Sequence, residues 1–84
     1  MYETPESLGF RITMIKSKIV KNNKLVKENI NNEDYVSTLL GLTKESMRLS
    51  GYLVRECEDN DGEYSRLYDE SFMIKKEVLR IHYE

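Results

Sequence analysis

The 84-residue chain contains no Ala, Gln or Trp, and it has one Cys, one His and one Pro. A single Cys excludes an intramolecular disulfide, and one Cys with one His cannot complete a closed zinc site without carboxylates. The four glycines, at positions 9, 41, 51 and 62, are too scattered for a phosphate-binding loop. We therefore expect no metal and no cofactor.

Long apolar runs are also missing, since none reaches even ten residues. We therefore expect no signal peptide and no membrane span, and hence a cytoplasmic protein. The chain is instead rich in Lys, Asn, Ile and Tyr, a bias that resembles translation from an AT-rich genome such as those of many phages and low-GC bacteria.

The sequence contains no recognisable set of catalytic residues. A Cys57–His82 pair would have to span roughly 30 Å if the last two predicted helices are antiparallel, at about 1.5 Å of rise per residue. The acidic stretch 58–62 superficially resembles a calcium loop, but with Gly62 as the loop glycine, Cys57 falls on the first ligand position and Tyr68 on the bidentate Glu position. We predict that the protein is not an enzyme.

Three helices are predicted, over residues 5–30, 33–57 and 63–83 of one small domain spanning 1–84. The first has a capping Thr4 followed by Pro5. Asn22 interrupts its apolar face, and we expect a register-setting polar residue there, with a functional contact as the alternative. Apolar residues recur on that face at helical spacing: Leu8, Ile12, Ile15, Ile19, Val26 and Ile30.

The central helix, 33–57, carries two apolar stripes on either side of a row of small residues. This pattern is typical of a helix with a neighbour on each side. The stripes are Val36, Leu40, Met47 and Val54, and Tyr35, Leu39, Leu42, Leu49 and Leu53, and the small residues are Thr43, Ser46, Ser50 and Cys57. The fold class is therefore all-α, a three-helix bundle or extended helical hairpin; a β-hairpin over Tyr52–Tyr68 is the alternative.

The last helix also carries two stripes, and its aromatic one has no predicted neighbour. We expect a partner-binding surface there, comprising Tyr64, Tyr68, Phe72, Leu79 and Tyr83, that oligomerises the protein, most simply as a homodimer. The alternative is that a second stripe of the first helix, Phe10, Met14 and Leu25, covers it inside a monomer.

Charge is uneven along the chain, because residues 11–27 hold six bases and no acid. A row of lysines there is a candidate contact for an anion, a nucleotide or a nucleic acid: Lys16, Lys18, Lys21, Lys24 and Lys27. The acidic overall balance, with a pI near 5.5, argues against it. We expect a protein-binding module, an inhibitor or adaptor of phage or mobile-element type acting on a host protein, with nucleic-acid or nucleotide binding through the first helix as the alternative.

Overall fold

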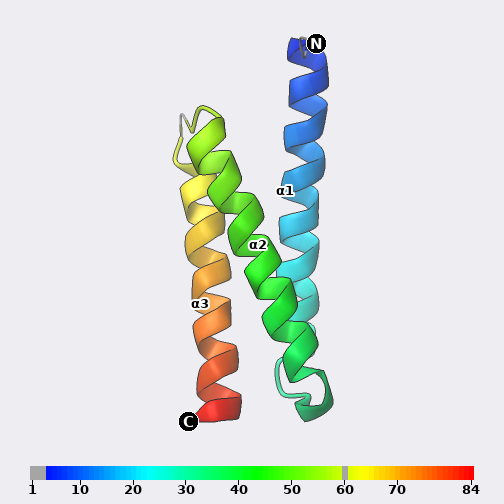
Figure 1. Ribbon diagram of the computed structural model, residues 1–84, viewed down its shortest axis with the longest axis vertical. Coiled ribbons are helices and arrows are strands. Elements are labelled where there is room, and N and C mark those ends of the chain that lie inside the picture. Colours follow the sequence, from blue (N-terminus) through cyan, green and yellow to red (C-terminus); the bar gives the residue numbers. More distant parts are fainter. Residues whose placement is uncertain (1–3, 60) are drawn as a thin grey trace.

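The computed structural model describes residues 4–59 and 61–84 and contains three α-helices joined by short connections (Figure 1). They are α1 (Pro5–Glu28), α2 (Val36–Glu56) and α3 (Glu63–Tyr83), with a 3₁₀ turn, η1 (Glu33–Tyr35), before α2. The predicted all-α three-helix bundle is confirmed. Residues 1–3 of the predicted domain, and Asn60 of the predicted 58–62 loop, lie outside the described residues.

The start of α1 follows the predicted capping chemistry. The Thr4 side chain accepts a hydrogen bond of 3.0 Å from the Ser7 amide, and Pro5 occupies the first helical position. The helix ends at Glu28, two residues earlier than predicted, and Asn32 then caps the 3₁₀ turn by accepting from the Asp34 amide.

The segments on both sides of the connection between α2 and α3 are helical, so the alternative β-hairpin over Tyr52–Tyr68 is wrong. Asp59 anchors the new helix, since its carboxylate accepts from the amides of Tyr64 and Ser65. Gly62 precedes α3 with φ +68°, a left-handed conformation that glycine adopts without strain.

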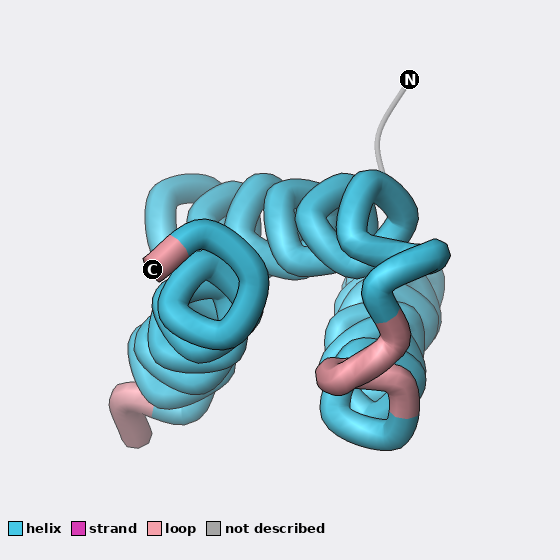
Figure 2. Tube along the Cα trace, turned by 90° about the horizontal axis from the view of Figure 1, so that it is seen from below, coloured by secondary structure: helices cyan, strands magenta, loops and turns pink. Residues whose placement is uncertain are grey.

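The central helix α2 packs against both of the others, whereas α1 and α3 contact each other much less. Figure 2 shows this from one end, with α1 and α3 lying apart and α2 crossing against both. The bundle is elongated, 46 × 20 × 18 Å, and the first turns of α1 extend past the ends of its neighbours (Figure 1). Within the described chain, no helix combines the length and apolarity that a membrane crossing requires.

Two apolar clusters form the core. One contains Val26, Leu39, Ile74 and Val78, and the other contains Ile19, Leu53 and Tyr64. Small and polar side chains are buried as well, which lets the helix backbones approach closely: Asn22, Asn23, Thr43, Ser46, Ser50 and Ser71. The predicted small-residue row of α2 is therefore buried at Thr43, Ser46 and Ser50.

Candidate protein-interaction surface

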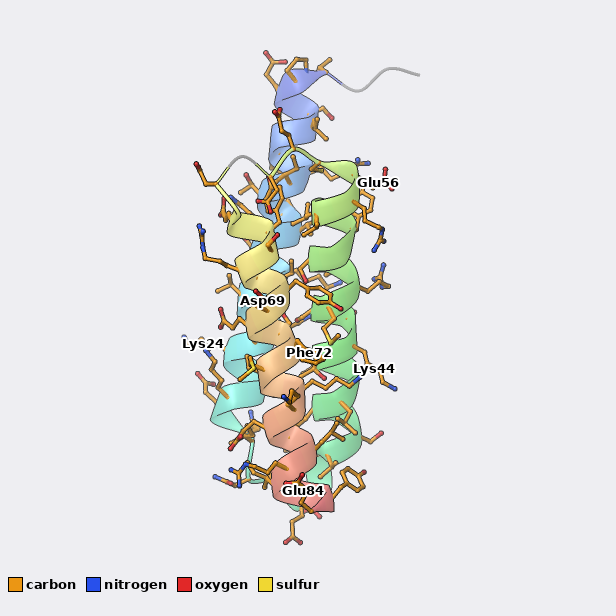
Figure 3. The ribbon with its side chains drawn as sticks, turned by 90° about the vertical axis from the view of Figure 1, so that its left-hand side faces the viewer. Lys24, Lys44, Glu56, Asp69, Phe72 and Glu84 are labelled. Carbon is orange, nitrogen blue, oxygen red and sulfur yellow. The ribbon has the colours of Figure 1, made fainter. Side chains whose placement is uncertain are left out.

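One face of the bundle carries large apolar side chains that the rest of the described chain leaves partly open to solvent. We call it the α2–α3 surface and define it by five residues: Val54 (39% exposed), Tyr68 (37%), Phe72 (43%), Leu79 (37%) and Tyr83 (67%). At 100° per residue the four α3 members fall within an arc of about 60° and extend over roughly 22 Å of helix. Figure 3 views this side, with α3 and α2 standing next to each other and Phe72 labelled between their ribbons.

Tyr68 rests against the backbone of α2. A Cβ on Gly51 would lie 3.8 Å from the Tyr68 ring, which is ordinary van der Waals contact. An open pocket of about 310 Å³ adjoins the ring, lined by Gly51, Val54, Arg55, Ser65, Tyr68 and Asp69. The α2–α3 surface is therefore concave at the end near Tyr68. The Tyr68 ring forms part of the pocket wall, and Arg55 and Asp69 also line the pocket.

Charged side chains also border the surface further along α3. The Lys76 ammonium lies 5.7 Å from the centroid of the Phe72 ring, within the range of a cation–π contact. Arg80 forms an ion pair with Glu77 on the same helix. Apolar side chains framed by charged ones have the composition expected of a protein interface with a polar rim.

Tyr64 does not belong to this surface, although we predicted it there. It is only 9% exposed and packs in the core with Ile19 and Leu53. This burial raises the pKa of its phenol. Tyr64 lies between the two apolar stripes of α3. In the first turn of α3, this side of the helix faces α1 and α2.

The second stripe of α1 does not cover the aromatic stripe, as the monomer alternative required. Phe10, Met14 and Leu25 are themselves exposed. Met14 instead lines an open groove of about 600 Å³ between α1 and α2, together with Leu49. Helix α3 keeps its aromatic stripe exposed because α1 lies against a different side of it.

Two of the predicted anion-contact lysines bind acids of α3 within the same chain. Lys16 Nζ lies 2.9 Å from Glu63 Oε1, and Lys27 Nζ lies 2.9 Å from Glu70 Oε1. The hydrogen bond that Lys16 donates to the Glu63 carboxylate raises the pKa of Lys16. Both pairs are partly exposed and link α1 to α3 beside the core clusters that contain Ile19 and Val26.

Lys18 is likewise engaged, 3.4 Å from Glu45 Oε1 of α2. The same oxygen accepts a hydrogen bond from Asn22, which lowers the pKa of Glu45 with a further contribution from Lys18. In the described part of the chain, Lys21 and Lys24 have no acidic partner within ion-pair distance. The structure therefore leaves two of the five lysines available to an anion.

The single Cys and His are kept apart. Cys57 follows α2 at one end of the bundle, whereas His82 lies in the last turn of α3 at the other end (Figure 1). His82 Nε2 is 2.7 Å from the carbonyl oxygen of Ile30 and so ties α3 to the α1–α2 connection. Among the described residues, no cluster of three or more His, Cys, Asp or Glu could hold a metal ion.

Sequence reasoning missed two contributors to the α2–α3 surface. Val54 was assigned to a stripe covered by a neighbouring helix, but it remains exposed beside Tyr68. Neither predicted stripe of the central helix includes Gly51, yet it is buried where Tyr68 approaches. A glycine within this helix does not by itself mark such an approach, because a Cβ on Gly41 would meet nothing within 4 Å.

Comparison of the chain with protein-family models, with curated proteins and with solved structures found no match.

Proposed function

We propose that this protein is a non-enzymatic protein-binding module, an adaptor or inhibitor, and that the α2–α3 surface is its binding site. The occupant is an amphipathic helix whose apolar face packs along α3. A helix fits because the exposed residues form a straight row that follows one helix face, which is how helices recognise each other through side-chain ridges and grooves.

The observation that carries this proposal is the exposure of three aromatic side chains on one face. An aromatic residue presents about 150–250 Å² when fully accessible, so Tyr68, Phe72 and Tyr83 together leave roughly 300 Å² open to solvent. Val54 and Leu79 add to this area. Patches of about 300–600 Å² are the largest that monomeric proteins usually carry, and they are frequently functional.

The size of the surface also bears on affinity. Burying roughly 300 Å² of apolar area contributes about 7 kcal/mol before any cost of association. The loss of translational and rotational freedom alone costs about 4–15 kcal/mol. The partner must therefore contribute a comparable apolar face, which again favours an amphipathic helix over a small polar ligand.

A photo-crosslinking experiment tests the proposal. Benzoylphenylalanine replaces Phe72 in one variant and Ser37, an exposed residue of α2, in a matched control. After irradiation in native cell extract, we expect protein adducts from position 72 only. Excess unlabelled protein should suppress them, whereas excess Phe72→Asp protein should not.

Circular dichroism provides the folding control, because Phe72→Asp changes an exposed residue and should keep the helical signal. Adducts identified by mass spectrometry then report either this chain or a different protein. Equal labelling from positions 72 and 37, or no protein adduct from position 72, would contradict the proposed function.

A further inference from the structure

The four α3 residues of the α2–α3 surface have a spacing that reads the same in both directions; Met73 is also exposed but lies outside their arc of about 60°. Tyr68, Phe72, Leu79 and Tyr83 are separated by four, seven and four residues, with a tyrosine at each end. When two copies of α3 pair antiparallel about an axis between residues 75 and 76, Tyr68 faces Tyr83 of the other copy and Phe72 faces Leu79. A two-fold symmetric interface requires this kind of self-complementary surface.

The charges of α3 favour the antiparallel direction over the parallel one. The charged residues beside the aromatic stripe are Asp69 in the first half of α3 and Lys76 and Arg80 in the second half, whereas Glu63 and Glu70 pair with Lys16 and Lys27 of α1. An antiparallel copy places Asp69 against the basic half of the other copy. A parallel copy would place like charges together, which is unfavourable.

In this antiparallel register, one pair of oppositely charged residues comes together between the two copies. Asp69 and Arg80 lie on the same flank of α3, beside the aromatic stripe, and both are exposed. In the antiparallel pairing, Asp69 of one copy falls within about two residues, or roughly 3 Å, of the level of Arg80 in the other. The symmetry produces this pair twice.

The pocket beside Tyr68 supplies an independent observation. It lies at the level where the antiparallel pairing places Tyr83 of the second copy, and Gly51, Val54 and Tyr68 form part of its wall. Tyr83 is the most exposed residue of the α2–α3 surface. A projecting aromatic ring on each copy thus meets a pocket on the other.

We propose that the α2–α3 surface binds a second copy of this chain, with the two α3 helices antiparallel and Tyr83 of each copy seated in the pocket beside Tyr68 of the other. This inference rests on the proposed function and specifies its partner. Helices α2 and α3 of both copies then form a four-helix layer, while α1 and its groove stay on the outside of the dimer.

Disulfide trapping tests the direction of pairing in the full chain. Two Cys57→Ser chains are prepared, one with Tyr68→Cys and one with Tyr83→Cys, and a mass tag distinguishes them. On mild oxidation of the mixture we expect the disulfide between positions 68 and 83 to exceed either same-position disulfide at least tenfold. Predominant 68–68 and 83–83 disulfides would overturn the antiparallel arrangement.

Light scattering and charge reversal supply a second readout that does not depend on introduced cysteines. We expect a mass of twice the 10.0 kDa chain. Asp69→Arg alone should weaken dimerisation at least tenfold, and Asp69→Arg with Arg80→Asp should restore it. A monomer at all concentrations up to about 1 mM, or no restoration in the double variant, would overturn this inference. Adducts from position 72 to a different protein would still support the proposed function.

Discussion

Asn23 of α1 and Ser71 of α3 form a buried hydrogen bond between helices that otherwise touch little. Asn23 Nδ2 donates to Ser71 Oγ at 3.1 Å, and Ser71 Oγ donates in turn to the Leu67 carbonyl at 2.9 Å. Both side chains are almost inaccessible to solvent. This chain of donors and acceptors fixes where α1 lies along α3.

Truncation of Asn23 should therefore destabilise the bundle. We expect Asn23→Ala to lower the free energy of unfolding by about 1–3 kcal/mol, because it removes a buried bond and leaves a partner group less well satisfied. Urea unfolding of Asn23→Ala, Ser71→Ala and the double variant, all at one protein concentration, measures the coupling. We expect about 0.5–1.5 kcal/mol; additive single effects would show that the bond contributes nothing.

Ser46 should respond in the opposite direction. Its Oγ is the buried side-chain polar atom that finds no hydrogen-bond partner in the described chain. An unsatisfied buried hydroxyl costs about 1–3 kcal/mol, and Ala is also the better helix former, so Ser46→Ala should raise the free energy of unfolding by about 1 kcal/mol or more.

Ser50 is the matched control for Ser46. It is equally buried on the same helix, but its hydroxyl donates to the Ser46 carbonyl at 2.7 Å. Ser50→Ala should gain less in urea unfolding than Ser46→Ala. An equal gain from both would show that the missing hydrogen bond is not the cause.

The two glycines of α2 should both accept alanine. A Cβ at Gly41 meets nothing within 4 Å, while one at Gly51 meets the Tyr68 ring at ordinary contact distance and the flexible end of Arg55 at 3.2 Å. Each replacement should stabilise by about 0.5–1 kcal/mol through helix propensity. Thermal unfolding checks this, and a destabilised Gly51→Ala would mean that Tyr68 packs more tightly on α2 than its contact distance indicates.

The features that sequence reasoning predicted well are those that local chemistry decides. Thr4 and Pro5 are residue types preferred at the first positions of a helix, and Gly62 readily takes the left-handed conformation found before α3. Exposure of Tyr68 and Phe72 also followed from a helix with more apolar surface than it has neighbours.

The features that were missed depend on how distant segments meet. Tyr64 is buried only because Ile19 and Leu53 reach it from two other helices. The Lys16–Glu63 pair joins residues 47 positions apart. Helical periodicity defines which face a residue occupies, but it carries no information on the relative height of two helices, and that height decides both outcomes.

Acid should weaken the start of α3. Burial alone raises the pKa of Asp59, but the hydrogen bonds from Tyr64 and Ser65 outweigh it, so the pKa lies below its ordinary value of 3.8. A lowered pKa means that the ionised carboxylate stabilises the folded state at pH above about 3.8, and that this contribution is lost as the pH falls through the folded pKa.

Asp59→Asn isolates this contribution. Its melting temperature should lie below that of the wild type at pH 7, and the difference should shrink as the pH falls towards 2, where Asp59 itself becomes protonated. Glu45 and Glu77 also have lowered pKa values, so both proteins should lose stability in acid. A pH-independent difference would mean that the charge of Asp59 does not matter.

Nucleic-acid binding through α1 should be weak, because Lys16, Lys18 and Lys27 are paired with acids and leave Lys21 and Lys24. Each phosphate contact contributes a slope of about −0.9 to log affinity against log salt on duplex DNA, so two lysines allow a slope no steeper than about −2. Fluorescence anisotropy with a labelled mixed-sequence duplex measures it. The double variant Lys21→Glu, Lys24→Glu should abolish this weak binding to the duplex, whereas Lys76→Glu on α3 should not. A slope near −5 would mean that all five lysines exchange their acidic partners for phosphates, and the basic helix would then be the main binding site.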